Sequence, residues 1–283
     1  MTLAILAGSV LLFLAGLWLI VRWGGMAIKP PAGGGPDREG RTARAAAMRR
    51  YFWWCNLWCF TALITGLLMT WPGGRLLMRI LAATSPGSAQ GRLTEAQANV
   101  GFITLDGTLA LLMFGGMPTA FVASLIYLTI HRWLPHGRLS GPLAGLLGIV
   151  VFGAGVEPFR TSNIDFTFIG PGWLSVLLFI LLAVLTGAIV AAVAGWYSQR
   201  LPLFTRQTVP AYLPLLTIIV FPPAAVLILL GALLVLAWPG VAAGGRNRML
   251  STRYLWAGRA FLALAVLLAL PAFAAAVSFV VTV

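Results

Sequence analysis

Apolar runs long enough to cross a membrane recur along the whole of this chain. They cover residues 3–21, 52–71, 104–130, 139–156, 173–196, 211–238 and 260–281. A helix needs about 20 consecutive apolar residues to span the hydrocarbon core of a bilayer. None of the stretches between the runs is long and polar enough for a separate soluble domain. The sequence therefore predicts one all-α integral membrane domain over residues 1–283, a polytopic transmembrane helical bundle of about seven spans.

Charge is scarce in this chain, and most of it is positive. Only 9% of residues are charged, against roughly a quarter in soluble domains. The net charge is +13, and the cations lie mainly between the apolar runs, where positive charge sets topology and meets anionic lipid headgroups. Membrane lipids are therefore the expected partners, and nucleic acid is not.

A basic loop over residues 22–50 sets the expected orientation. Its cations are Arg22, Lys29, Arg38, Arg41, Arg44, Arg49 and Arg50. Positively charged loops stay in the cytoplasm, so we expect a cytoplasmic loop here and an extracytoplasmic N-terminus. The first run has no positive segment before it, which favours a retained helix over a cleaved signal peptide.

The sixth run, residues 211–238, allows two topologies because it contains three prolines. A single crossing gives seven spans, with about 11 cations inside and 8 outside. A proline-broken re-entrant hairpin gives six spans, with about 15 inside and 4 outside. Continuous hydrophobicity favours seven spans, and the side on which residues 239–259 lie depends on this choice. Helix kinks are expected at Pro118, Pro222 and Pro223.

Residues 72–103 form the longest polar passage between two runs, and we expect them to be an extracytoplasmic polar or amphipathic segment. Arg75 and Arg79 stand four apart among leucines, which predicts a basic amphipathic turn lying on the membrane surface. Charges beside membrane spans often mark functional sites, because burying them is costly. The candidate outer polar cluster consists of Arg75, Arg79, Glu95, Asp106, Glu157, Arg160 and Asp165. The alternative is that these are loop charges, paired with nearby arginines and exposed to water.

Catalytic and metal-binding patterns are missing from the sequence. His131 and His136 are the candidates for metal ligands, but they lie five apart across a proline and lack the i, i+4 spacing of a helical zinc motif. Cys55 and Cys59 share a helical face and are interpreted as packing residues. With no Ser/His/Asp arrangement and no phosphate-binding glycine loop, a non-enzymatic protein is favoured. No metal is expected, and the cofactors are unknown.

Two stretches of the chain resemble a family of uncharacterised bacterial polytopic membrane proteins. One contains "RLLMRILAATS", "QGRLTEAQANVGFITLDGTL" and "HRWLP", and the other is "IDFTFIGPGWLSVLLFILLAVLTG". Together they cover spans two to five, a little under half of the chain. The resemblance implies a multi-pass helical protein of the bacterial cytoplasmic (inner) membrane, and it implies no activity.

Three functional hypotheses follow. The first is a structural or accessory subunit of a membrane assembly, with other membrane subunits or a second copy as partners. The second is a small-molecule or lipid transporter or channel with an extracytoplasmic polar vestibule, formed by residues 75–106 and 157–171. The third is a membrane enzyme that acts on a lipid at that same outer surface.

Overall fold

In the part of the chain that the computed structural model describes, five helical segments are long and apolar enough to cross a membrane: Thr2–Trp23, Arg44–Thr84, Leu105–Ile130, Gly172–Ser198 and Thr252–Thr282. The structure describes residues 2–31, 41–95, 98–156, 158–160, 162–219, 221–238 and 252–282. Within these ranges the chain is helical, and its extended backbone is limited to one isolated bridge between Leu93 and Asn99. The all-α architecture that the sequence predicts is therefore confirmed, whereas seven spans are not.

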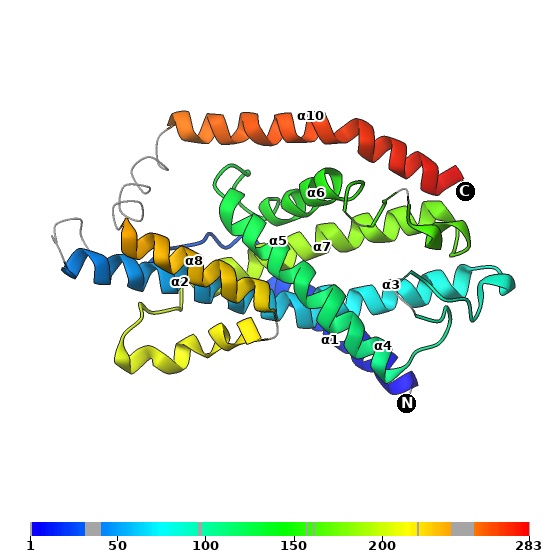
Figure 1. The fold of residues 1–283 in the computed structure, drawn as a ribbon, viewed down its shortest axis with the longest axis horizontal. Helices are drawn as coiled ribbons and strands as arrows, with labels where there is room; N and C mark the ends of the chain where they lie inside the picture. Colours follow the sequence, from blue (N-terminus) through cyan, green and yellow to red (C-terminus); the bar gives the residue numbers. More distant parts are fainter. Residues whose placement is uncertain are drawn as a thin grey trace.

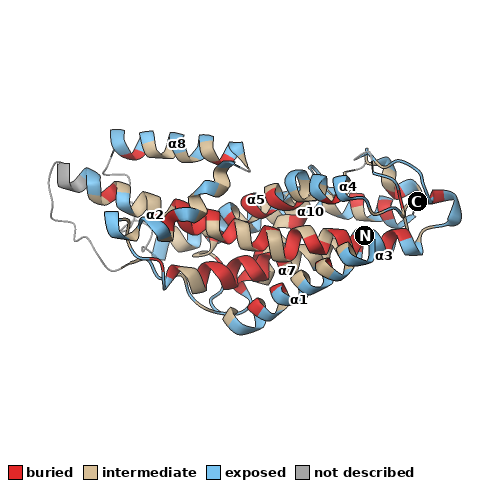
Figure 2. Cartoon of the chain, turned by 90° about the horizontal axis from the view of Figure 1, so that it is seen from below, coloured by how far each residue is buried: buried red, intermediate tan, exposed pale blue. Residues whose placement is uncertain are grey.

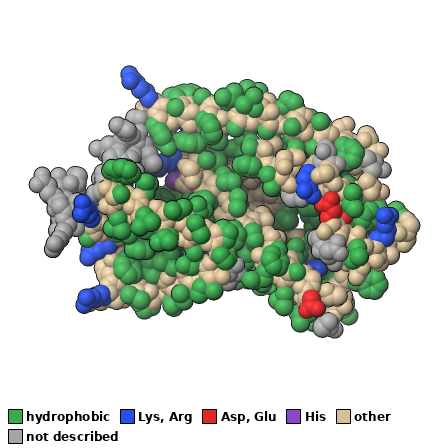
Figure 3. All heavy atoms as spheres, viewed as in Figure 1, with side chains coloured by type: hydrophobic (Ala, Val, Ile, Leu, Met, Phe, Trp, Pro, Cys, Tyr) green, Lys and Arg blue, Asp and Glu red, His purple; other side chains and the backbone are tan. Residues whose placement is uncertain are grey.

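The long helices lie roughly along one axis, so the molecule has two distinct ends (Figure 1). Helix α1 (Thr2–Trp23) begins, and α10 (Thr252–Thr282) ends, at the end shown on the right. We call this the terminal end, and the opposite one, where α2 (Arg41–Thr65) begins, the basic end. Figure 3 shows that, on the face in view, charged side chains gather near these two ends and hydrophobic ones fill most of the surface between them.

Helix α7 (Gly172–Ser198) forms the centre of the bundle and packs against α1, α2, α6 and α10. Its second half is almost entirely buried, as Figure 2 shows in red. Small residues permit this packing. A Cβ on Gly187 would collide with the Gly141 carbonyl oxygen of α6 (Ser140–Phe152). The backbones of α6 and α7 therefore touch, as expected for membrane helices that associate through glycine and alanine.

The second span extends further than the sequence predicts. The predicted run ends at Trp71, but α2 continues through a π-helical segment, η1 (Gly66–Thr70), into α3 (Trp71–Thr84). Pro72 has no N–H for the Leu68 carbonyl, and a Cβ on Gly16 of α1 would lie 2.5 Å from that oxygen. The wider π turn and the close glycine accommodate the proline without ending the helix. Residues 75–84 are thus the last turns of a long helix, and their position on the membrane surface stays a prediction.

A second π-helical segment lies opposite the first. Helix α4 (Leu105–Ala110) passes through η3 (Leu111–Gly116) into α5 (Met117–Ile130), with Pro118 in the first turn of α5. The Thr70 hydroxyl of η1 donates a hydrogen bond of 2.7 Å to the Gly116 carbonyl. The two irregular segments therefore pair in the bundle. Thr104 caps α4 by accepting from Gly107 N.

The fourth and sixth runs depart most from the sequence-based expectation. Helix α6 ends at Phe152, so its 13 residues extend only about 20 Å. The sixth run is not one helix. A 3-10 segment, η5 (Arg206–Ile219), is followed by α8 (Pro222–Ala237), which runs back in the opposite direction (Figure 1). Pro222 and Pro223 occupy the first turn of α8, where a missing N–H is harmless. The single tilted crossing predicted for residues 211–238 is therefore wrong.

Helix α10 lies along one side of the bundle and packs against α6 and α7. Near the basic end, a Cβ on Gly258 would collide with the indole of Trp133, and Arg259 Nε donates 3.3 Å to the Trp133 carbonyl. Near the terminal end, Ala276 and Val280 share a buried cluster with Phe159 and Val176. Much of the remaining α10 surface is exposed, including Leu264, Leu267 and Leu268.

Candidate functional site

A pocket of about 160 Å³ lies at the terminal end of the bundle. It is enclosed by residues 75–82 of α3, residues 98–103, residues 163–169 and Phe179 of α7. Two connecting segments that are far apart in the sequence thus meet over the last turns of α3. We call this space the Arg75 pocket, after the most buried charged side chain in its wall.

Arg75 is the most unusual member of the pocket, because only 7% of its surface is exposed. Its Nη2 donates a hydrogen bond of 2.7 Å to the hydroxyl of Thr108 in α4. That hydroxyl donates in turn to the Thr104 carbonyl at 2.6 Å, so its oxygen is free to accept from the guanidinium. Arg75 Nε is buried without a hydrogen-bond partner. Among the described residues, no carboxylate forms an ion pair with Arg75.

Arg79 lines the same pocket one helical turn later and is exposed. Its Nη1 donates 3.1 Å to the Gly101 carbonyl. Gly101 has a φ of +87°, in the left-handed region that favours glycine, and this conformation turns the segment back over α3. Residues i and i+4 of a helix share a face, so two guanidinium groups border one small cavity.

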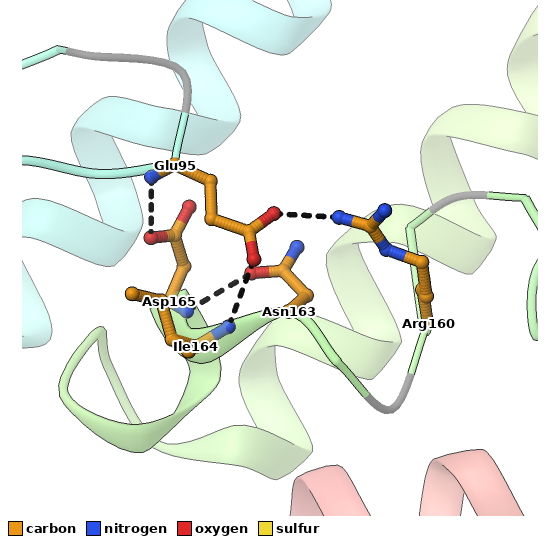
Figure 4. Close-up of polar contacts among 5 residues, drawn as sticks. All are labelled: Glu95, Arg160, Asn163, Ile164 and Asp165. Atoms are coloured by element: carbon orange, nitrogen blue, oxygen red, sulfur yellow. Dashed lines mark hydrogen bonds and ion pairs between the residues drawn. The ribbon is translucent and has the colours of Figure 1, made fainter.

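Glu95 fastens the two connecting segments together over the pocket (Figure 4). Its carboxylate accepts from Arg160 Nη2 at 2.7 Å and from the backbone N–H of Ile164 at 3.3 Å. Its own backbone N–H donates 3.0 Å to Asp165 Oδ1. We call this set of contacts the Glu95 latch. It joins residues on either side of the pocket, namely the segment that carries Thr94 and the one that carries Asn163.

Asp165 connects the latch to the pocket, since it accepts from Glu95 N and also lines the cavity. Burial raises the pKa of its carboxyl group above the ordinary value, and the nearby negative charge of Glu95 adds to this effect, against the opposing hydrogen bond from Glu95 N. Asn163 Oδ1 accepts from Asp165 N at 2.9 Å and fixes the start of this turn. The pocket therefore holds two arginines and one carboxyl group that takes up a proton more readily than usual.

The structure places the members of the predicted outer polar cluster in three ways. Arg75, Arg79 and Asp165 border the pocket, and Glu95 and Arg160 form the latch. Asp106 is exposed in the first turn of α4 and has no ion pair among the described residues. Glu157 lies outside the described residues. The alternative of paired loop charges thus applies to Glu95 and Arg160, and it does not apply to Arg75.

Sequence reasoning missed the neutral partners of the site. Thr108, Asn163 and Phe179 gave no signal, because a threonine in a helix, an asparagine in a loop and a phenylalanine in a span are common in any membrane protein. The turn that Asn163 caps becomes visible only in the structure, where its Oδ1 accepts from Asp165 N.

The metal and cysteine candidates lie away from this pocket. His131 closes α5, where its Nδ1 lies 2.8 Å from the Leu128 carbonyl, and burial lowers its pKa. Cys55 and Cys59 are free and buried in α2. No group of three His, Cys, Asp or Glu side chains that could hold a metal ion occurs in the described part of the chain.

The pocket has the features of a binding site for a negatively charged group. Guanidinium groups bind carboxylates and phosphates through paired hydrogen bonds, and the remaining walls are largely apolar, with Leu81, Phe166 and Phe179 among them. Comparisons of this chain with known protein families, curated proteins and solved structures found no match. The Arg75 pocket is therefore the basis for the function proposed below.

Proposed function

We propose that this chain is a non-enzymatic integral membrane protein that binds the anionic group of a small molecule or lipid in the Arg75 pocket, as the recognition step of transport. One observation carries the proposal. Arg75 is 7% exposed, has an unpartnered Nε, and has no carboxylate partner among the described residues. A buried charge without a counter-charge is strongly destabilising, and an anion bound in the pocket would remove that cost.

The proposal also assigns the pocket to the extracytoplasmic side. Six spans, namely the five long helical segments and the shorter α6, with a re-entrant hairpin formed by η5 and α8, put about 15 cations inside and 4 outside. Two observations support this arrangement: α1 begins and α10 ends at the same end of the molecule, and α8 runs back along η5 (Figure 1). A topology reporter fused after Arg248 should then give a cytoplasmic signal. An external signal would restore seven spans.

Anion-dependent stability tests the binding proposal directly. The full chain, purified in neutral detergent, is heated in chloride, sulfate, phosphate or acetate at constant ionic strength. A ligand at a hundred times its dissociation constant stabilises the folded state by about 2.7 kcal/mol. We expect an oxyanion to raise the unfolding midpoint of the wild type, and Arg75→Gln to abolish this rise. Arg79→Gln should weaken the rise.

Arg92→Gln is the matched control for that measurement. Arg92 belongs to the same connecting segment but lies over the Phe168 ring, 4.2 Å from its centroid, and does not line the pocket. The variant loses the same charge as Arg79→Gln and should respond to oxyanions as the wild type does. Equal loss in Arg92→Gln and Arg75→Gln would mean that the response is a general charge effect, and the proposal would fail.

An accessory-subunit role is the second candidate, and the surface of α10 favours it. Only 11% of the hydrophobic window of this helix is buried within the chain. Either lipid or a partner subunit would cover the rest of the helix. The native mass of the protein distinguishes these two possibilities when it is purified from its own membranes in mild detergent. A mass above that of a monomer or homodimer supports the subunit role. A lone 30.1 kDa chain argues against it.

A further inference from the structure

We infer that the Arg75 pocket takes the oxyanion head of a membrane amphiphile, such as a lipid phosphate or a fatty carboxylate, which enters sideways from the outer leaflet. This inference rests on the proposed function, because it requires that the pocket binds an anion. It adds the class of ligand and the route of entry. Three features of the pocket support it: its size, its walls and its mouth.

The size of the pocket limits what it can enclose. Its volume is about 160 Å³, close to that of an engineered apolar cavity of about 150 Å³ that binds benzene. Pockets for whole drug-sized ligands occupy about 300–1,000 Å³. Only a small head, a phosphate or a carboxylate with the first atoms attached to it, can fit inside. The rest of a larger ligand must lie outside the pocket.

The walls favour a head that carries apolar atoms. Arg75 and Arg79 supply the positive charge from one side, and Leu81, Phe166 and Phe179 are among the apolar side chains that complete the enclosure. A fully hydrated inorganic ion would lose its water against these side chains without gaining contacts from them. An ester or alkyl carbon next to the charged group would gain such contacts.

The mouth of the pocket has the composition of a membrane interface. Met78 is 45% exposed and Phe102 is 67% exposed, and both line the pocket beside the exposed Arg79. Next to them, Leu105 and Leu109 of α4 are exposed by about half. Apolar side chains around a cation are typical of segments at the boundary between headgroups and acyl chains. An amphiphile can therefore place its head between the two arginines and keep its chain in the bilayer.

The Arg75 guanidinium lines the pocket and is held there by one hydrogen bond. Its Nη2 is held by Thr108, while its Nε is buried without a partner. A phosphate or carboxylate oxygen in the pocket can pair with the Arg75 guanidinium, which lines the wall, while Arg79, one turn away, supplies a second charge-assisted hydrogen bond. Thr108 thus acts as a positioning residue that fixes the orientation of the guanidinium.

The test compares one anion with and without an apolar chain. The full chain in neutral detergent is titrated with inorganic phosphate and with dodecyl phosphate, and bound ligand is counted by native mass spectrometry. Dodecyl phosphate should bind at least about tenfold more tightly, since burial of two methylene groups against protein is sufficient for that ratio. Arg75→Gln should lose binding of both ligands, and Arg79→Gln should weaken it. Arg92→Gln should match the wild type.

A variant at the mouth of the pocket measures the contribution of the ligand's apolar chain apart from that of its charged head. It gives a result even if the Arg75 variants do not fold. Phe102→Ser changes an exposed side chain and should weaken dodecyl phosphate several-fold, while leaving inorganic phosphate unchanged. If inorganic phosphate binds as tightly as dodecyl phosphate, the amphiphile inference is overturned and the anion pocket stands. If neither ligand binds, both proposals fail. If every variant binds dodecyl phosphate equally, its binding is unspecific adsorption and the inference is overturned.

Discussion

The two ends of this molecule use arginine in opposite ways. At the basic end, Arg200 is exposed, donates 3.1 Å to the Trp196 carbonyl near the end of α7, and covers the Trp196 ring at 4.5 Å. Arg259 is exposed as well, and lies over Trp256 while it donates to Trp133. At the terminal end, Arg75 is buried and bonded to a single hydroxyl among the described residues.

The difference in burial distinguishes arginines that set the orientation of a membrane protein from an arginine that can bind a ligand. The exposed arginines keep their hydration and bind carbonyl groups at helix ends, where positive charge is favourable. They need no further partner. Arg75 is 7% exposed and gains no negative charge from the described residues in return. Arginine at a buried position is therefore informative in this chain, while the abundance of arginine is not.

Replacement of each type of arginine with an apolar side chain of similar length should have the largest effect. Arg75→Met should abolish the oxyanion response and leave the anion-free unfolding midpoint unchanged or higher, because it removes an uncompensated buried charge. Arg200→Met should leave the oxyanion response intact. Thermal unfolding in neutral detergent, with and without phosphate, measures both quantities.

A purely structural Arg75 would give the opposite result. If its bond to Thr108 mainly holds α3 against α4, Arg75→Met should lower the anion-free midpoint, and Thr108→Val should lower it to a similar extent. That outcome would make the two ends alike, with arginines that only support the fold, and would remove the basis of the binding site.

Oxyanion binding at the terminal end should depend on pH through Asp165. The Asp165 carboxyl accepts from Glu95 N of the neighbouring segment, and Asp165 lines the same pocket as Arg75 and Arg79. Its pKa is raised, so acidification protonates it before an ordinary aspartate, and a competing negative charge leaves the pocket. Oxyanion affinity should therefore rise several-fold as the pH falls through this raised pKa. Asp165→Asn should bind oxyanions at neutral pH as the wild type does in acid.

The contribution of Asp165 to the free energy of unfolding should also be larger at low pH. The folded protein holds the Asp165 proton more tightly than the unfolded chain, so this group favours folding at low pH, and its contribution is lost as the pH rises through the folded pKa. His131, at the basic end, is the control, because it is a titratable side chain far from the pocket, and burial lowers the pKa of its imidazole. His131→Gln should keep the pH dependence of oxyanion binding. Loss of that dependence in His131→Gln, with retention in Asp165→Asn, would contradict the assignment.

Sequence periodicity predicted the long spans well and failed where backbone geometry overrides hydrophobicity. The run that contains α7 matches its helix closely, because it holds no proline and its small residues suit close packing. The end of span two was misplaced, because Pro72 follows a π turn that no local pattern reveals. For the sixth run, apolar length argued for one crossing, whereas Pro222 and Pro223 start a new helix.

The candidate site was predicted in its charges but not in its arrangement. Arg75, Arg79 and Asp165 were selected because they stand beside apolar runs, and they do meet at one pocket. The burial of Arg75 could not be anticipated, because it depends on helix α3 continuing and on residues 98–103 folding back over it. Composition identifies a rare charge. Tertiary structure decides whether water reaches it.

The smallest expected effect concerns the Glu95 latch, which has no counterpart among the arginine–carbonyl contacts of the basic end. Glu95→Gln removes the ion pair with Arg160, whose side chain is 42% exposed, and exposed pairs contribute at most about 1 kcal/mol. The unfolding midpoint should therefore change little. Because the latch joins the two segments over the pocket, however, their local opening should become more frequent. Backbone hydrogen exchange within residues 98–103 should accelerate in Glu95→Gln and stay at the wild-type rate in Arg259→Gln. Equal acceleration in both variants would mean that the whole bundle has loosened, and unchanged exchange in Glu95→Gln would mean that the pocket is closed by its apolar walls alone.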